Sequence, residues 1–300
     1  MQYPKVALTF ADQLELMKTR GLHVGDEQVA LEVLRRVSYY RVAGYLFRFR
    51  LPGSDNFEPG ASFDEAVRLY EFDRQLRLLV LDAVERLEVA LRTAITYEFG
   101  HLYGPFGHVS LVNFAAERRA GEHANWLATV RAEAGRAQEL FVRSYAGKYE
   151  GFPDLPIWMA SEVMSFGTLS RMLASMKNPD QRAVARHFDV HQAVLPGWFH
   201  ALSVVRNRCA HHSRLWNWQL GVTPRRITNS PAWNRQVLRH ANRTFYVLLV
   251  IRKLLRSAGD GHVDTWRDSV TELLRPILAM PRYQDEMGAH RHWEADPLWH

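Results

Sequence analysis

Apolar residues recur every three or four positions through most of this chain, the spacing that buries one face of an α-helix. The longest such segment follows Ser62-Phe63-Asp64-Glu65, where Ser62 is placed to cap a helix and Glu65 to bond back to the cap. No proline or glycine interrupts the chain from Ser62 to Gly100, where a loop rich in Gly, His and Pro is expected to begin and to continue to about Val112. The pattern therefore predicts a single helix that approaches about 55 Å in length.

Shorter helices are expected on both sides of that segment. Thr9 and Asp26 are suited to cap the first two, with Gly21 closing the first. The other predicted helices cover residues 123–145, 157–176 with an interruption near Gly167, a short stretch from Asn178-Pro179, 196–212, 230–257 and 264–279. Period-two alternation with hairpin turns is absent, so no sheet is expected. We predict an all-α fold.

The composition predicts a folded cytoplasmic protein. The 300 residues are 47% hydrophobic, enough for a sizeable core. The single cysteine, Cys209, excludes an internal disulfide and fits a reducing compartment. Met1 to Ala11 lack the charged-then-apolar layout of a signal peptide. The apolar run Phe245 to Ile251 is far shorter than the roughly 20 residues of a membrane span, so no membrane partner is expected.

Charge is distributed unevenly along the chain. The net charge is +6, yet Val190 to Gly259 contain no Asp or Glu. This acid-free segment carries eleven basic residues, which are Arg206, Arg208, Arg214, Arg225, Arg226, Arg235, Arg239, Arg243, Arg252, Lys253 and Arg256. The remainder has 27 basic and 32 acidic residues. A basic zone on an otherwise mildly acidic protein predicts binding of a nucleic acid or another phosphate-bearing partner.

Inside the acid-free segment, Arg206, Asn207 and His211 form a candidate catalytic group. Asn207 and His211 are four residues apart and share a helix face, and the long Arg206 side chain can swing toward them. These three side chains are expected to come together at a site that contains no carboxylate. The basic residues and histidine around it, namely Arg208, His212, Arg214, Arg225 and Arg226, are expected to bind RNA.

These residue types suit RNA cleavage. The ribose 2′-OH attacks the adjacent phosphorus when a base removes its proton and an acid protonates the leaving 5′-oxygen. Imidazole serves either task at neutral pH. A guanidinium stabilises the negative charge of the phosphorane, and no metal or other cofactor is required. The products would carry a 2′,3′-cyclic phosphate and a 5′-hydroxyl.

A single chain supplies only one clearly placed Arg–His pair. Because acid and base together need two groups, we expect a homodimer whose two motifs meet. His212 is the alternative second group, although adjacent helical residues point about 100° apart.

Structural interpretations compete for several of these residues. Cys209, His211 and His212 suggest zinc, but zinc needs four ligands and no second cysteine exists, so Cys209 is better read as a small buried residue. Trp216, Trp218 and Trp233 can stack on bases but are more often core aromatics. His290, His292 and His300 form a loose group without an expected function.

Arg206 to His211 resembles the signature of the HEPN superfamily. That signature is an arginine and a histidine separated by four to six residues, usually with a polar residue directly after the arginine. Other segments are similar to the AbiD/AbiF abortive-infection family, namely 11–14, 20–22, 37–41, 44–45, 86–93, 155–158, 165–170 and 206–216.

The resemblance implies a HEPN-like antiparallel four-helix bundle core at about residues 61–259. An N-terminal helical extension, 1–60, and a C-terminal helix and tail, 260–300, would flank it. It implies a metal-independent, toxin-like endoribonuclease of anti-phage defence that is typically dimeric, and Arg206, Asn207 and His211 are the matching motif residues. Some relatives are associated with a small structured RNA. Arg92 and Glu162 lie in similar segments.

Two other functions remain open. A non-catalytic RNA-binding protein would use the basic zone to hold a small structured RNA. A nucleotide transferase or phosphate-binding protein is less favoured, because the phosphate-loop pattern Gly-x-x-x-x-Gly-Lys-Ser/Thr is absent.

Overall fold

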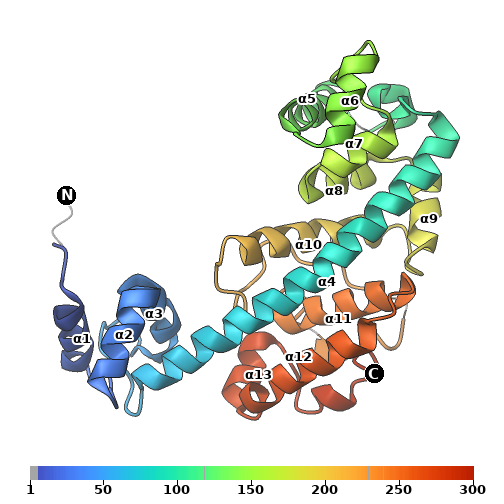
Figure 1. Cartoon of the computed structure of the whole chain (residues 1–300). Helices are drawn as coiled ribbons and strands as arrows, with labels where there is room; N and C mark the ends of the chain where they lie inside the picture. Colours follow the sequence, from blue (N-terminus) through green and yellow to red (C-terminus); the bar gives the residue numbers. More distant parts are fainter. Residues whose placement is uncertain (1–5, 118, 229, 239) are drawn as a thin grey trace. The chain divides into compact units, whose positions relative to one another are not determined.

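The computed structural model describes residues 6–117, 119–228, 230–238 and 240–300. Met1 to Lys5, part of the region tested for a signal peptide, and Arg239 of the acid-free segment lie outside the described residues. The chain forms two compact units, residues 1–75 and 76–300. The regular elements of the described ranges are all helices (Figure 1), which confirms the all-α class. The division at residues 60 and 259 stays a prediction, as does the four-helix bundle.

The first unit begins with capped helices, as the sequence predicts. In α1 (Phe10–Thr19), Thr9 and Asp12 form a reciprocal capping box, and in α2 (Glu27–Val37) the Asp26 carboxylate accepts from two backbone N–H groups. Next comes α3 (Tyr39–Leu46), followed by a 3₁₀ turn, Phe47–Phe49. The Tyr45 hydroxyl donates to Asp73 at 2.6 Å in the buried interior, so a polar pair ties α3 to the start of α4.

Helix α4 (Phe63–Tyr103) is the long predicted helix, and its 41 residues span about 60 Å. Ser62 Oγ accepts from the Glu65 backbone N–H at 3.2 Å, as its capping role requires. The helix continues three residues beyond Gly100, which was expected to begin a loop. Gly104, with φ +73°, adopts the left-handed conformation that follows the helix end.

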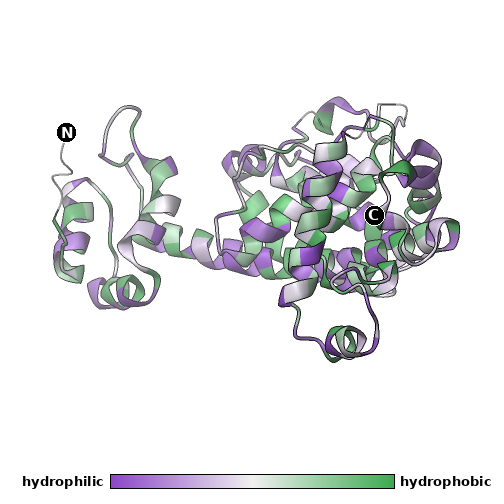
Figure 2. Cartoon of the chain, turned by 90° about the horizontal axis from the view of Figure 1, so that it is seen from above, coloured by the Kyte–Doolittle hydropathy of each residue, from purple (hydrophilic) through white to green (hydrophobic). Residues whose placement is uncertain are grey.

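The second unit places two groups of helices along its part of α4 (Figure 1). The first group contains α5 (Ala120–Arg136), α6 (Leu140–Lys148), α7 (Ile157–Val163), α8 (Phe166–Ser175) and α9 (Asn178–Arg186). The second contains α10 (Leu195–Ala210), α11 (Thr244–Ser257), α12 (Val263–Leu278) and α13 (Pro281–Met287). Figure 2 shows hydrophobic and hydrophilic residues interspersed along these helices, as expected when each buries one face.

Three helix boundaries differ from the sequence prediction. The single helix expected over 123–145 is two helices, with Ala137 to Glu139 between them. Asn178 is the first residue of α9 and not its cap, which is Lys177. The last long helix begins at Thr244 instead of Ser230.

A compact set of contacts explains the late start of α11. Trp233 lies between Trp198 and Tyr246, with ring centroids 5.2 and 5.6 Å away. Arg235 donates to Asp296 at 2.6 Å. These tertiary contacts outweigh the local helix signal of Ser230-Pro231.

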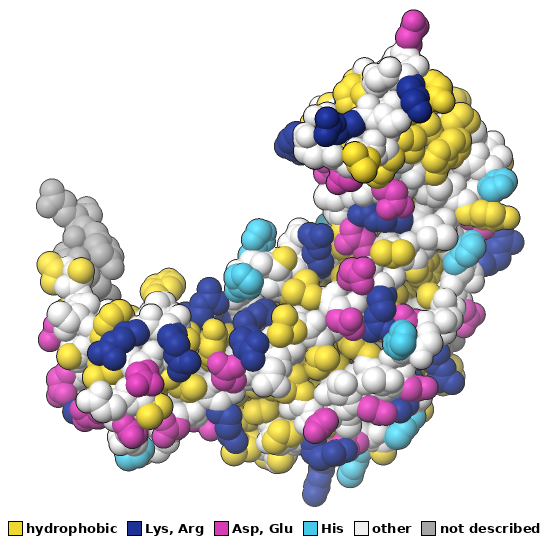
Figure 3. Space-filling view, in the orientation of Figure 1, with side chains coloured by type: hydrophobic (Ala, Val, Ile, Leu, Met, Phe, Trp, Pro, Cys, Tyr) yellow, Lys and Arg dark blue, Asp and Glu magenta, His cyan; other side chains and the backbone are white. Residues whose placement is uncertain are grey.

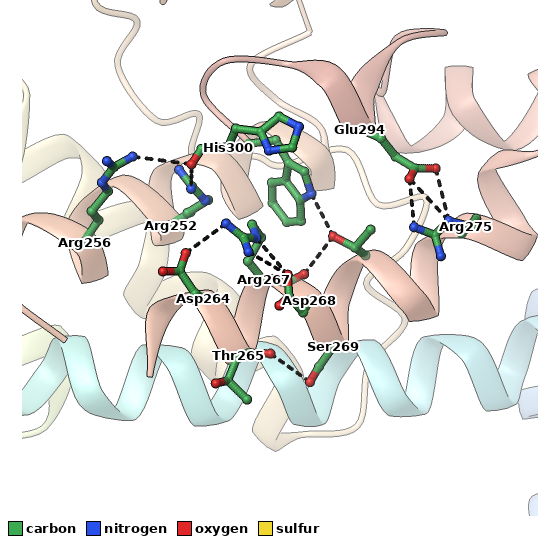
Figure 4. A network of polar contacts seen from close by, with 12 residues as sticks. Arg252, Arg256, Asp264, Thr265, Arg267, Asp268, Ser269, Arg275, Glu294 and His300 are labelled. Atoms are coloured by element: carbon green, nitrogen blue, oxygen red, sulfur yellow. Dashed lines mark hydrogen bonds and ion pairs between the residues drawn. The ribbon is translucent and has the colours of Figure 1, made fainter. Parts of the chain in front are cut away.

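The end of the described chain folds back onto α11 and α12. Arg252, only 3% exposed, donates to the backbone oxygens of Leu298 and His300, and Arg256 Nη1 also donates to His300 at 3.4 Å (Figure 4). The Trp299 indole donates to Thr271 at 2.9 Å. Trp293, Asp296 and Trp299 of this C-terminal tail are buried, so the tail is packed against the unit.

Within the ranges described, no helix combines the length and apolar character that crossing a bilayer requires.

The buried His108 provides an acid-sensitive element in this unit. Its side chain is 1% exposed, and burial lowers its pKa from 6.5 to about 4. Below about pH 6.5 the His108 imidazole is protonated in the unfolded chain but stays neutral in the folded chain. The free energy of unfolding therefore falls as the pH drops toward about 4.

We expect this site to remove on the order of 3 kcal/mol of unfolding free energy between pH 6.5 and 4. Denaturant unfolding at several pH values checks this. His108→Gln should flatten the dependence, whereas the exposed His200→Gln should leave it unchanged. An equally steep loss in His108→Gln would contradict the assignment.

Candidate active site at the end of helix α10

The predicted motif lies on the last turn of α10 because the preceding turns are anchored in the core. Trp198, Leu202, Val205 and Cys209 recur at helical spacing and are buried. This face packs against α8. Burial of Cys209 agrees with its interpretation as a small core residue. The neighbouring positions 206, 207 and 211 consequently point away from the most buried face.

A Schellman motif ends α10 immediately after the motif. The His212 backbone N–H donates to Cys209 and the Ser213 N–H to Arg208, at 3.0 Å each. His212 occupies the position where glycine is usual and has φ +57°. It therefore lies beyond the helix, and the 100° argument that disfavoured it as a second catalytic group does not apply.

His212→Gly is expected to stabilise the second unit, because a non-glycine residue in the left-handed region costs about 1 kcal/mol. Thermal unfolding at neutral pH measures this, with Ser213→Gly as a neighbouring control. If His212 also contacts RNA, the same variant should bind RNA more weakly while being more stable. A destabilised His212→Gly would show that contacts of the imidazole outweigh the backbone cost.

Arg206, Asn207 and His211 lie together at this helix end. Arg206 Nη1 donates to Asn207 Oδ1 at 3.2 Å, and the His211 backbone N–H donates to the Asn207 carbonyl at 2.9 Å. Asn207 and His211 are exposed, and the Arg206 side chain is 39% exposed. The His211 ring has no hydrogen-bond partner among the described residues, so its nitrogens are accessible to a ligand.

A carboxylate also belongs to this group, contrary to the expectation of a carboxylate-free site. Glu88 of α4 is buried, and its Oε2 lies 3.8 Å from Arg206 Nη2. The acid-free segment does not predict an acid-free site, because a helix distant in sequence supplies the acid. Glu88 is the residue that the sequence analysis missed as a site residue. Its helical spacing from Arg92 was the available signal.

Arg92 completes the buried part of the cluster. Its Nη2 donates to Glu88 Oε1 and to the Met164 carbonyl, the latter at 2.8 Å. Glu88 is thus held by one arginine and faces a second. A buried carboxylate in this position orients the Arg206 guanidinium and leaves part of it available to an anion.

Two arginines predicted to bind RNA take part in the local structure of the loop after α10, Arg208 with its side chain and Arg214 with its backbone carbonyl. Arg208 Nε donates to the Arg214 carbonyl at 2.5 Å, and its guanidinium lies 4.2 Å from the Trp218 ring centroid. The other two tryptophans, Trp216 and Trp233, are buried, in agreement with the core interpretation.

Arg225 and Arg226 lie near the opposite end of α10. Trp198 Nε1 donates to the Arg225 carbonyl at 2.7 Å, and Arg225 Nη1 donates to Ala193 at 3.0 Å. Trp198 of α10, which bonds to Arg225, is 13 residues before His211, a distance of about 20 Å along the helix axis. The eight predicted residues therefore form two groups, with Arg206, Asn207, Arg208, His211, His212 and Arg214 in the first.

Other basic residues of the acid-free segment also have partners within the chain. Lys253 pairs with Asp189 at 2.7 Å, in addition to the contacts of Arg235, Arg252 and Arg256 described above. Figure 3 shows Lys and Arg interspersed with Asp and Glu on the face in view, without one continuous basic patch there. Folding thus brings carboxylates from outside the segment to Arg206, Arg235 and Lys253.

The fold and this site define an all-helical protein with an Arg-Asn-x-x-x-His helix end. The sequence pattern of the Abi-like protein family matches residues 32–217, which include α4, α10 and the whole of the Arg206–His211 motif. The chain belongs to the Abi-like protein family. This membership suggests a role in abortive infection, a form of defence against phage. Neither a curated protein nor a solved structure matches the chain.

Proposed function

We propose that this chain is a cytoplasmic, metal-independent endoribonuclease of abortive infection. One observation carries the proposal. His211 and Asn207 are exposed at the same helix end as Arg206, and the buried Glu88 faces the Arg206 guanidinium. The group provides a proton carrier and a positive charge at one helix end, which are two of the three functions that 2′-OH attack on a phosphodiester needs; the third is a second proton carrier.

In the proposed reaction, the 2′-oxygen forms a bond to phosphorus and the bond to the 5′-oxygen breaks. A base takes the 2′-OH proton, and an acid gives a proton to the leaving oxygen. Arg206 would bind a non-bridging oxygen and stabilise the phosphorane, while His211 would carry one of the two protons. Asn207 would position the imidazole or the phosphate.

The second proton carrier is supplied by a second copy of the chain in this proposal. His211 is a single exposed imidazole, and two such helix ends in a homodimer would place an acid and a base on one phosphodiester. This arrangement agrees with the HEPN resemblance. His212, in the left-handed position after the helix, is the alternative within one chain.

Incubating the purified full chain with cellular RNA in EDTA tests the proposal. We expect cleavage at defined positions, with 2′,3′-cyclic phosphate and 5′-hydroxyl ends found by end-specific sequencing. Sequencing of RNA that copurifies with the chain would identify a bound structured RNA. Salt-sensitive binding without any cleavage would instead favour the non-catalytic RNA-binding function, which Arg225 and Arg226 at the far end of α10 would serve.

A further inference from the structure

A surface groove of about 470 Å³ lies between the last turns of α4 and helix α7. Figure 1 shows these two elements next to each other. Its lining residues are Thr93, Thr96, Tyr97, Gly100 and His101 from α4, and Trp158 and Glu162 from α7. The volume is within the range of small-ligand sites. The predicted catalytic motif contributes no residue to it.

Exposed aromatic rings form both walls of the groove. Tyr97 is 58% exposed and packs on His101, with ring centroids 4.3 Å apart. Trp158, on the opposite wall, is 49% exposed. Exposed rings on two sides of a groove provide flat apolar faces that suit stacking with a base.

The floor of the groove is rigid because the two helices touch there. A Cβ on Gly100 would lie 3.4 Å from Ile157 Cγ2, and Thr96 Oγ1 bonds Ser161 Oγ at 2.9 Å. The walls are therefore carried by packed helices and not by loops, a property of preorganised binding sites.

Glu162 supplies the carboxylate among the residues that line the groove. It is exposed and lies one turn after Trp158 on α7. An ionised carboxylate only accepts hydrogen bonds. Its partner must offer donors. Adenine, cytosine and guanine each offer two N–H groups on an exocyclic amine, whereas uracil offers only its single ring N–H.

The helices that line the groove also carry the buried cluster that faces Arg206. Its first residue, Thr93, follows Arg92, which bonds Glu88 and the Met164 carbonyl. Met164 is two residues after Glu162, and Glu88 faces Arg206. The buried ion pair of Glu88 and Arg92 therefore connects the helices of the groove to the Arg206 guanidinium.

We propose that this groove binds an unpaired base of the RNA, stacked on Trp158 and Tyr97, and that Glu162 favours bases that carry an exocyclic amine. This assignment rests on the proposed function, whose substrate it makes more specific. The groove would select the nucleotide that is presented near the Arg206–His211 helix end.

Calorimetric titration of the full chain with CMP and UMP, two nucleotides of equal charge and similar size, tests this directly. We expect CMP to bind more tightly than UMP. Trp158→Ala should weaken CMP binding about tenfold or more, as loss of one stacking contact implies. Glu162→Gln should bring the CMP-to-UMP affinity ratio close to one, because an amide both donates and accepts. Tyr149→Ala, which removes an exposed aromatic directly after α6, is the matched control.

The outcomes separate the two proposals. CMP binding that depends on Trp158 and Glu162, without RNA cleavage, would support the groove and remove the nuclease function. Cleavage that depends on His211 but proceeds normally in Trp158→Ala and Glu162→Gln, with no CMP binding, would overturn the groove assignment alone. A loss of dimer mass in Trp158→Ala would also overturn it, because the groove would then be a contact between copies of the chain. Circular dichroism confirms that each variant is folded.

Discussion

Arg206→Ala and His211→Ala should each lower RNA cleavage at least a hundredfold. Removing a general acid or base typically costs about 10²- to 10⁴-fold, and removing a charge stabiliser costs about 10²- to 10³-fold. Both side chains are accessible at the end of α10, so the loss should occur without unfolding. Single-turnover cleavage of a defined RNA in EDTA measures the effect.

The chain offers matched controls for both variants. His200 is an exposed histidine on the same helix, and Arg182 is an exposed arginine on α9. His200→Ala and Arg182→Ala should cleave RNA at the rate of the unaltered chain. The double variant Arg206→Ala/His211→Ala should be little slower than either single variant, because the two groups act in one step. Single variants that cleave within threefold of the controls would show that the catalytic centre lies elsewhere.

Asp296→Asn should destabilise the second unit by about 3 kcal/mol at pH 7, because it breaks a buried ion pair by removing one partner. Asp296 is 1% exposed and accepts from Arg235 Nη2 and His290 Nε2 at 2.6 Å and from the Leu298 N–H at 2.8 Å. An asparagine retains the shape but not the charge that these donors need.

The pH dependence of that variant gives a second test. Burial would raise the pKa of Asp296, but the hydrogen bonds from Arg235, Leu298 and His290 bring it below the usual value. The stabilisation is therefore present at neutral pH and is lost as the pH falls through the pKa of the folded state. Thermal unfolding should show a large difference between Asp296→Asn and the unaltered chain at pH 7 that narrows in acid. Asp285→Asn, at an exposed position, is the control. Equal melting temperatures of Asp296→Asn and Asp285→Asn at pH 7 would refute a stabilising role for the Asp296 ion pair.

Local signals predicted the helices whose ends are fixed by nearby residues. Thr9, Asp26 and Ser62 cap helices as expected, because capping depends only on the three or four residues that follow. Gly100 was misinterpreted since a glycine has two uses. It permits close approach to Ile157 here, whereas Gly104 provides the positive φ after the helix.

The break at 137–139 left a fainter signal in the sequence. Val142 is buried, yet it is out of phase with the buried Ala134 of α5. One continuous helix would have turned Val142 about 80° away from that face. Gly135, two residues before the break, is a local signal that agrees with this change of phase.

The candidate site was predicted in part. Its position on one helix end followed from the spacing of Asn207 and His211, which a helix brings onto one face. Glu88 was not predicted, because contact between α4 and α10 joins residues more than a hundred positions apart. The ion pairs of the basic zone were equally non-local. Lys253 and Arg235 pair with Asp189 and Asp296, which lie outside the acid-free segment.

The most direct test of the account replaces a single ribose in the RNA. Once a cleavage position is mapped, the same RNA is made with a 2′-deoxynucleotide immediately 5′ of that phosphate and incubated with the chain in EDTA. The account predicts that cleavage at this bond disappears while other positions are cut, leaving cyclic phosphate and 5′-hydroxyl ends. Cleavage of the deoxy-substituted bond at an unchanged rate, or products with 5′-phosphate ends, would contradict it.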